Sequence, residues 1–249
     1  GLGDVYKRQA EYRKRAADLV AQMTLHEKVS QMLSWAPAIE RLGIPAYNWW
    51  SEGIHGVGRA GTATVFPQAI GMAAAFDEDM MEQVGNAIGV EARGKYNMCR
   101  AHGDRDIFKG LTVWAPNINI FRDPRWGRGH ETYGEDPFLT SRLGVRFVEG
   151  MQGNDPDYLQ AAACAKHFAV HSGPESDRHH FNAIVSKQDL WETYLPAFRA
   201  LVKEAGVEAV MGAYNRTNGE PCCGSKTLLK DILRDKWHCL LYTSDAADD

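Results

Sequence analysis

The chain has 249 residues, of which 44% are hydrophobic and 24% are charged, so it can bury one sizeable core or two small ones. Its formal net charge of −4 and its pI near 6.2 provide no basic field for phosphates, and nucleic acid is therefore not an expected partner. No stretch approaches the ~18 apolar residues of a membrane span, and five cysteines without CxxC spacing indicate neither a disulfide framework nor a zinc site.

Capping residues predict the helices in chain order. A charged amphipathic helix is expected from Ala10, and Thr24 with Glu27 forms a capping box that opens a second helix. Later helices are predicted to start after Asp77, at Asp136-Pro137, at a cap formed by Ser186 and Asp189, and at Ser225. Apolar residues follow these caps at helical spacing, among them Val29, Met32, Leu33, Met81, Val84, Ile88, Ala92, Leu228, Leu229, Ile232 and Leu233.

Three short apolar runs between these helices are predicted to be strands. They are residues 111–116, 160–168 and 207–214. Their apolarity is continuous rather than alternating, which indicates strands that are covered on both faces. Repeated strand-helix units predict a parallel sheet, either doubly wound or closed into a barrel.

The polar residues that follow the strands favour the barrel. Lys166-His167 stands at the end of one strand, Tyr214-Asn215-Arg216 at the end of another, and the arginines of 122–128 follow a third. Polar groups at strand carboxyl ends are typical of a barrel active-site face, whereas no GxGxxG follows a strand as dinucleotide binding would require. We therefore predict an α/β fold, a TIM-like (β/α)8 barrel that is incomplete at the C-terminus.

Three polar clusters permit a functional and a structural interpretation. Residues 121–137 pack three arginines and four carboxylates, which suits either a solvated loop of salt bridges or an Arg128 fork for sugar hydroxyls or a carboxylate. His167 and His171, with His179 and His180 beyond, invite a metal interpretation, but the Glu of HExxH is absent and Gly173-Pro174 breaks any helix there.

An aromatic cluster is the third. Trp49 and Trp50 stand beside Glu52 and His55; paired tryptophans are usually core residues, yet an indole face with a nearby carboxylate also suits a sugar ring. Together with Lys166 and His167 as hydrogen-bond donors at a strand end, this points to a polyhydroxylated ligand rather than to a metal.

Four long motifs in unbroken order carry a family resemblance over about residues 10–237. They are residues 47–77 (YNWWSEGIHGVGRAGTATVFPQAIGMAAAFD), 117–137 (NINIFRDPRWGRGHETYGEDP), 165–181 (AKHFAVHSGPESDRHHF) and 208–225 (EAVMGAYNRTNGEPCCGS). The chain resembles the N-terminal barrel domain of glycoside hydrolase family 3, the β-glucosidases and β-xylosidases. This resemblance implies a retaining mechanism, no cofactor and no metal.

The resemblance also implies roles for individual residues. Glu52, Arg59 and Arg128 match the groups that grip the non-reducing sugar. Lys166 and His167 match the family's Lys-His pair, and Tyr214 matches the tyrosine beside the nucleophile. Many glucosidases of this family have the shorter Asp at the position of Glu52, whereas the Trp-Trp-Ser-Glu form of this chain is similar to the β-xylosidase branch, so the resemblance favours xylose over glucose.

The sequence departs from the family at the two carboxyl groups that retaining hydrolysis requires. Asp245 is the candidate nucleophile, but the family's glycines are missing from 238–244 and the Ser-Asp pair arrives one residue early, which in a strand turns the side chain to the other face. The acid/base is expected beyond residue 249. Residues 1–9 and 238–249 resemble peptides translated from sequencing-adapter DNA, so we expect a non-native leader, a truncated barrel domain at 10–237 and a non-native tail.

The expected function is that of an exo-acting retaining β-glycosidase. Its substrates would be β-linked oligosaccharides or aryl and alkyl β-glycosides, with no nucleic acid or membrane partner, and the full-length protein would supply the missing C-terminal domain. The 249-residue chain itself is expected to bind sugar weakly without hydrolysing it. A non-catalytic carbohydrate-binding barrel is the alternative, and the resemblance suggests a periplasmic or secreted protein although no signal peptide is visible.

Overall fold

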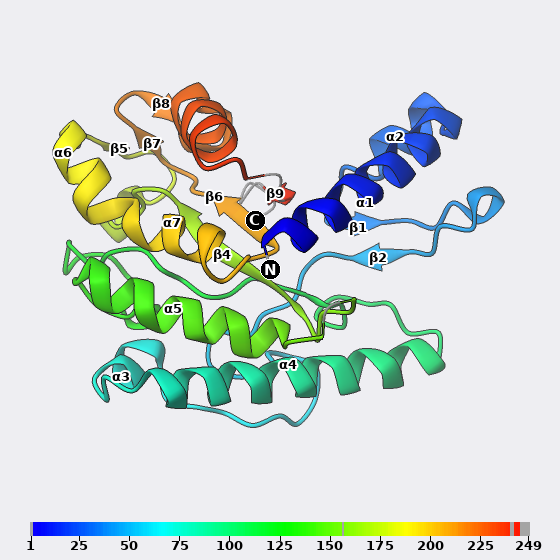
Figure 1. The fold of residues 1–249 in the computed structure, drawn as a ribbon, viewed down its shortest axis with the longest axis horizontal. Helices are drawn as coiled ribbons and strands as arrows, with labels where there is room; N and C mark the ends of the chain where they lie inside the picture. The colour runs from blue at the N-terminus through cyan, green and yellow to red at the C-terminus, as the bar shows by residue number, and fades with distance from the viewer. Residues whose placement is uncertain (1, 156, 240–241, 245–249) are drawn as a thin grey trace.

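A computed structural model describes residues 2–155, 157–239 and 242–244, in which helices and short strands alternate (Figure 1). The α-helices are α1 (Leu2–Gln22), α2 (Leu25–Ser30), α3 (Ala69–Ala73), α4 (Glu78–Ala101), α5 (Pro137–Gln152), α6 (Lys187–Asp189) and α7 (Pro196–Lys203). The strands are β1 (Trp35–Ala36), β2 (Tyr47–Asn48), β3 (Thr112–Val113), β4 (Ala162–Phe168), β5 (Asn182–Ala183), β6 (Ala209–Gly212), β7 (Arg216–Thr217), β8 (Glu220–Pro221) and β9 (Tyr242–Ser244). Two π-helical segments are η4 (Leu190–Tyr194) and η6 (Lys226–Lys236), and 3-10 turns span Glu40–Leu42, Gly129–Glu131, Glu175–Asp177 and Cys222–Gly224.

The predicted helix caps are confirmed. The Thr24 side chain accepts a hydrogen bond from the Glu27 backbone N–H at 3.2 Å, and Glu27 accepts one in return from the Thr24 backbone at 2.8 Å, which completes the capping box. The remaining caps also accept from a backbone N–H in the first turn; they are Asp77, Asp136, Ser186 and Ser225.

The predicted start of the first helix is wrong. The structure begins α1 at Leu2 rather than at Ala10. Residues 2–9 contain no proline, and because adding a residue to an existing helix fixes few dihedral angles per hydrogen bond, the helix extends through them without an apolar stripe. A second difference lies just after it, where Val29, Met32 and Leu33 have the predicted spacing but are exposed.

The main sheet has four parallel strands in the order β3-β4-β6-β9. A parallel bridge from Ser51 to Val113 adds the segment after β2 to the β3 side of this sheet. The three strands predicted from the sequence are therefore β3, β4 and β6, paired in parallel as expected. Within the described residues the sheet is open, and its parallel strands with intervening helices have the α/β arrangement of a TIM-like barrel.

Alternate residues of β4 and β6 face two different environments. Ala163, Ala165 and Val210 join the large core between the sheet and the helices, whereas Cys164 and Met211 belong to a small cluster on the other face. This alternation follows from the two-residue period of a strand. It explains the continuous apolarity of the sequence, because both faces of these strands are covered.

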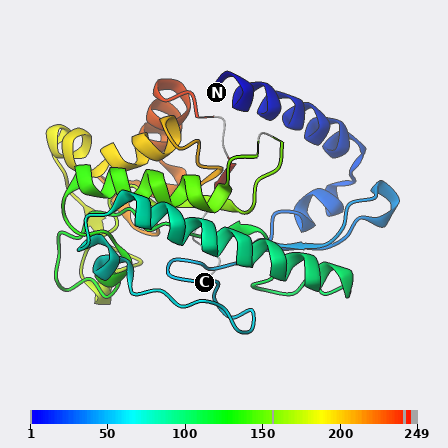
Figure 2. The ribbon, with the colours of Figure 1, turned by 60° about the horizontal axis from the view of Figure 1, so that its bottom comes forward.

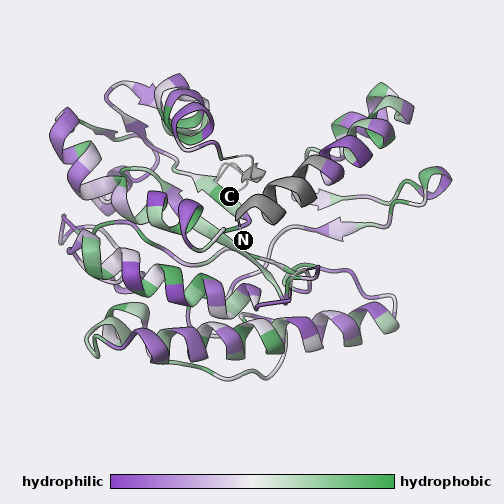
Figure 3. Cartoon of the chain, in the orientation of Figure 1, coloured by the Kyte–Doolittle hydropathy of each residue, from purple (hydrophilic) through white to green (hydrophobic). Residues whose placement is uncertain are grey.

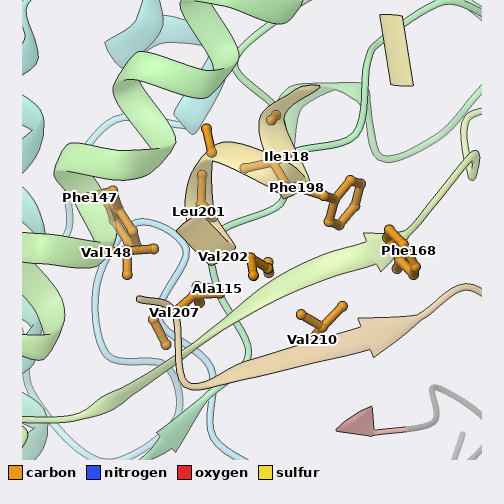
Figure 4. Close-up of a cluster of buried hydrophobic side chains, with 14 of the residues drawn as sticks. Ala115, Ile118, Phe147, Val148, Phe168, Phe198, Leu201, Val202, Val207 and Val210 are labelled. Carbon is orange, nitrogen blue, oxygen red and sulfur yellow. The ribbon is translucent and has the colours of Figure 1, made fainter. Parts of the chain in front are cut away.

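The large core is filled by side chains from the helices that cover the sheet. Figure 4 shows Phe147 of α5, Phe198 and Leu201 of α7, Phe168 of β4 and Val210 of β6 in this core, and all five are fully buried. The rings of Phe168 and Phe198 meet edge to face with centroids 4.9 Å apart. The core thus fixes β4 and β6 against the helices and determines where their carboxyl ends lie.

Helices α4 and α5 lie side by side in both views of the ribbon (Figures 1 and 2). Glycines permit this close approach, because a Cβ at Gly85 would collide with the Phe147 carbonyl and one at Gly150 with the Glu82 carbonyl. Hydrophilic and hydrophobic residues alternate along both helices, as expected of amphipathic elements (Figure 3). None of the helices in the described part of the chain has the length and apolarity needed to cross a membrane.

Candidate functional site

A cavity of about 200 Å³ lies at the carboxyl ends of the parallel strands. It is lined by Trp50, Glu52, Trp114, Arg128, Lys166, His167, Arg178, Met211 and Tyr214. This volume lies below the roughly 300–1,000 Å³ of pockets for drug-sized ligands, so it suits a ligand the size of one sugar ring.

Neighbouring strands deliver these side chains to one place. Trp50 and Glu52 flank Ser51, which bridges to β3, and Trp114 directly follows β3. Lys166 and His167 lie near the end of β4. Met211 and Tyr214 are at the end of β6. The carboxyl ends of parallel strands meet at one edge of the sheet, and this edge is the active face of a barrel. The sequence prediction that Glu52, Arg128, Lys166, His167 and Tyr214 converge agrees with this placement.

Arg128 is held by two partners. Its Nε and Nη2 donate to the two carboxylate oxygens of Glu131 at 2.8 and 2.7 Å, and its Nη1 lies 3.1 Å from Nε2 of His167. A guanidinium carries five N–H groups, so two remain without a partner among the described residues. Burial acts against both charges, but the bidentate pairing prevails: it raises the pKa of Arg128 and lowers the pKa of Glu131.

His167 is buried and neutral. Its Nδ1 lies 2.9 Å from the side-chain oxygen of Asn119, which also accepts from the His167 backbone N–H at 2.9 Å. Burial, followed by the positive charge of Arg128, holds the pKa of His167 well below its ordinary value of 6.5. Both ring nitrogens are occupied by protein partners, so the expected donation of a ring N–H to a ligand is not available in this arrangement.

Lys166 points into the same cavity with its ammonium group unpaired in the described part of the chain. The residue is 5% exposed, and burial together with the nearby charge of Arg128 lowers the pKa of Lys166 to about 8. At neutral pH it is therefore still cationic and has three hydrogens to donate. Such a group provides a strong site for ligand oxygens, because burial without a partner costs free energy that a bound hydroxyl would offset.

Aromatic rings also line the cavity. Trp50 and Trp114 pack with ring centroids 4.5 Å apart, and Trp114 donates its indole N–H to the Trp49 carbonyl at 2.6 Å. Trp50 lines the cavity and Trp49 does not, but both pack against the small cluster of Trp114, Cys164, Ala209 and Met211. The pair therefore combines the two interpretations, since both rings contribute to packing and one of them is also at the cavity.

Arg59 is the predicted site residue that does not line the cavity. Its guanidinium lies 5.3 Å from the centre of the Phe108 ring, and the residue is exposed in a left-handed backbone conformation. Arg178, which the sequence interpretation did not select, lines the cavity and pairs with Glu175 at 3.2 Å. Its position within residues 165–181 was the only sequence signal for it, and that signal did not distinguish it from its neighbours.

The loop of residues 121–137 combines both interpretations given above. Asp123 pairs with Arg125 at the surface, where the bond from Arg125 lowers the pKa of Asp123 to about 2. Arg128, three residues on, is directed into the cavity. The loop is therefore a salt-bridged surface loop that also delivers one half-buried cation to the cavity.

The histidines pack together without forming a metal centre. The His167 and His171 rings lie 4.6 Å apart, but each directs Nδ1 to an asparagine, Asn119 and Asn215 respectively. Across the described ranges, no group of three or more His, Cys, Asp or Glu is placed to hold a metal ion.

The nucleophile candidate Asp245 lies outside the described residues. The strand before it, β9, pairs in parallel with β6 in the register Ala209 to Tyr242 and Met211 to Ser244.

Tyr214 lies at the end of β6, and the centroid of its ring is 4.7 Å from the centroid of the His179 ring. The described lining of the cavity thus combines cations, aromatic rings and the carboxylate of the exposed Glu52.

The chain matches known proteins over most of its length. Residues 15–239 match the model of the glycosyl hydrolase family 3 N-terminal domain. Over 229 residues the chain is 52% identical to a xylan 1,4-beta-xylosidase of Xylanibacter ruminicola, covering 90% of this chain and 27% of the relative. Over 255 residues it is 46% identical to probable beta-D-xylosidase 7 of Arabidopsis thaliana, covering 94% and 32%.

Solved structures give the same result. A GH3 exo-beta-xylosidase in complex with a xylobiose aziridine probe superposes with a TM-score of 0.83 at 35% identity, covering 93% of this chain and 31% of that structure. DesR, a beta-glucosidase from Streptomyces venezuelae in complex with D-glucose, gives a TM-score of 0.78 at 34% identity, covering 93% and 28%. The chain thus spans about 30% of the length of the relatives it matches.

Proposed function

Because the chain belongs to the glycosyl hydrolase family 3 N-terminal domain family, we propose that its cavity is the subsite for the non-reducing sugar of an exo-acting, retaining β-glycosidase. The observation that carries this proposal is the convergence of Arg128, Lys166 and Trp50 on one cavity of about 200 Å³. Cationic donors and an indole face are the groups that recognise a polyhydroxylated ring.

Each residue has a role that its surroundings support. Lys166 and the two remaining N–H groups of Arg128 donate to sugar hydroxyls, Glu52 accepts from them at the rim, and Trp50 packs on the ring. Tyr214 lines the same cavity from the end of β6. Arg59 joins the site only if the loop that carries it differs in the complete protein, since here it rests on Phe108.

We propose D-xylose rather than D-glucose as the preferred sugar. The named relatives given above at 46% and 52% identity are xylosidases, although a beta-glucosidase with bound D-glucose has the same fold. Glu52 supports the choice, because a longer acid than Asp reaches further into a site for a pentose that lacks the hydroxymethyl arm. Substrates of the whole protein would then be β-linked oligosaccharides or aryl and alkyl β-glycosides.

We further propose that the 249-residue chain binds sugar weakly and does not hydrolyse glycosides. Retention requires two carboxyl groups about 5 Å apart. No pair of carboxyl groups in the described site can fill these two roles, because both oxygens of Glu131 are hydrogen-bonded to Arg128. Under this proposal residues 10–237 are the native barrel segment, and a further domain of the full-length protein supplies the acid/base.

Calorimetric titration with D-xylose and D-glucose tests the binding role. D-xylose should bind weakly and saturably, and more tightly than D-glucose, and Arg128→Lys should abolish the binding because Lys cannot occupy a bidentate partner and donate to a ligand at once. Arg125→Lys is the matched control, since Arg125 makes a bidentate pair with Asp123 in the same loop but at the surface. Equal loss in both variants would contradict the assignment.

Turnover of an aryl β-D-xyloside tests the catalytic part. The 249-residue chain should show none, whereas the full-length gene product should hydrolyse it with retention of configuration. Turnover by the 249-residue chain that Asp245→Asn abolishes would overturn the inactivity. A full-length protein that binds D-xylose but hydrolyses no glycoside would favour the alternative, a non-catalytic carbohydrate-binding barrel.

A further inference from the structure

The site contains an asparagine within residues 117–137 that the sequence interpretation did not select and that does not line the cavity. Asn119 is 2% exposed, and its amide nitrogen donates to the carbonyls of His167 at 2.8 Å and Ala169 at 3.1 Å. These two bonds identify which side-chain atom is the nitrogen, because backbone carbonyls only accept. The other atom, the oxygen, must therefore be the one that faces His167.

This orientation determines the tautomer of His167. The Asn119 oxygen can only accept, so the hydrogen of the neutral imidazole resides on Nδ1, 2.9 Å away. Nε2 is then left with a lone pair, and it faces Nη1 of Arg128 at 3.1 Å, a group that can only donate. The two ends of the ring agree on one assignment.

We propose that Asn119 is a positioning residue of this site: it holds His167 in the Nδ1–H form and thereby keeps an acceptor against Arg128, which fixes the guanidinium for the sugar. Glu131 restrains the Nε edge of the same guanidinium and His167 restrains Nη1, so the two remaining N–H groups have one orientation. This inference deepens the proposed function and rests on it for its ligand, but not for the tautomer.

The surroundings of His167 reinforce the neutral ring. The groups that act on its charge are Arg128, His171, Lys166 and Arg178, each of which is cationic or becomes so on protonation. Glu131, which also lies beside Arg128, is paired with that guanidinium. A protonated His167 would present an N–H to Arg128 instead of a lone pair, and the pair would separate.

The first experiment measures the tautomer and needs no sugar. In the wild-type 249-residue chain, the ¹⁵N shifts of His167 should show a protonated Nδ1 and an unprotonated Nε2 that do not titrate at pH values around 6.5, the ordinary histidine pKa. An Nε2–H tautomer, or titration near the ordinary value, would overturn the proposal. If D-xylose fails to bind the wild type at any pH, the proposed function fails while this readout still decides the role of Asn119.

The second experiment uses Asn119→Asp. A carboxylate beside Nδ1 favours the imidazolium and raises the pKa of His167, which ¹⁵N shifts of the variant locate. Below that pKa the variant should bind D-xylose about tenfold more weakly than above it, the loss expected for one hydrogen bond to a charged group. Wild-type affinity should be constant over the same range, and a pH-independent affinity in the variant while His167 titrates would refute the proposal. Should the variant not fold, the wild-type tautomer decides.

The chain offers a matched control in a second asparagine-histidine pair. Asn215 accepts from Nδ1 of His171 at 3.0 Å, and its amide nitrogen donates to the Val170 and Arg216 carbonyls. Nε2 of His171 is buried without a partner among the residues that the structure describes, and His171 does not line the cavity. Asn215→Asp should therefore protonate His171 without making D-xylose affinity depend on pH, because a charged His171 further disfavours protonation of His167. A pH dependence equal to that of Asn119→Asp would show a general effect of the acid and contradict the positioning role.

Discussion

Glu131→Gln removes the carboxylate that neutralises Arg128 and keeps the shape of the side chain. Gln can accept one hydrogen bond from the guanidinium, but its amide N–H₂ then opposes the second donor. The half-buried Arg128 and the buried Lys166 would be left as cations that line the same cavity without this carboxylate. The fold should therefore lose stability although no packing volume changes.

The magnitude follows from burial. Exposed pairs contribute about 0–1 kcal/mol, whereas removing one partner of a buried pair costs about 3–5 kcal/mol. The side chains of Arg128 and Glu131 are 20% and 17% exposed, so the lower end of the buried range, about 3 kcal/mol, is expected. For a chain of this length that corresponds to a fall in Tm of about 6–12 °C.

Thermal unfolding followed by circular dichroism at low and high salt measures this. The fall should persist at high salt because the pair is shielded from counterions. Asp123→Asn is the control: its pair with Arg125 has similar geometry, 2.8 and 3.0 Å, but Arg125 is 71% exposed, so Tm should stay within error of the wild type. A Tm for Glu131→Gln that is unchanged, or lowered no more than in the control, would refute the buried assignment.

Three further predictions concern charge and specificity. Burial lowers the pKa of His171 from 6.5 to about 4, so on acidification the unfolded chain binds this proton before the folded chain does. In urea titrations the free energy of unfolding should therefore keep its full value above pH 6.5 and fall by about 3 kcal/mol toward pH 4. His171→Gln should reduce this fall, and a fall of unchanged size in the variant would contradict the prediction. Burial lowers the pKa of Lys166 from 10.5 to about 8, which means that its charge destabilises the fold at neutral pH. Lys166→Met should therefore raise Tm at pH 7, by an amount that vanishes toward pH 10.5, and should abolish D-xylose binding. A lower Tm in the variant would contradict the cost assigned to this charge. Glu52→Asp should shift calorimetric preference from D-xylose toward D-glucose, and an unchanged ratio would remove Glu52 as the specificity residue.

The sequence predicted the elements whose signals are local. Caps such as Asp77 and Ser225 depend on a side chain and a backbone N–H three residues away, so they are visible in the sequence and are confirmed. The parallel strands were predictable because burial on both faces leaves continuous apolar runs. The start of α1 was not, because helix extension needs no apolar pattern.

The site was predictable where a strand end delivers the residue and only in part where a loop does, since Arg128 on its loop was predicted correctly. Lys166 and His167 lie near the end of β4, and their position follows from the sheet. Arg59 and Arg178 lie on loops, whose paths depend on distant contacts such as the Phe108 ring and Glu175. The role of Asn119 was not visible in the sequence either, since it depends on backbone carbonyls brought within reach by folding.

The central claim is that the cavity at the strand ends binds one sugar through its buried cations. Calorimetric titration of D-xylose into the wild-type chain and into Lys166→Met, at pH 7 and under conditions where both are folded, tests it most directly. Saturable 1:1 binding to the wild type and none to the variant is the predicted result. Equal binding by both proteins, or no binding by the wild type, would contradict the claim.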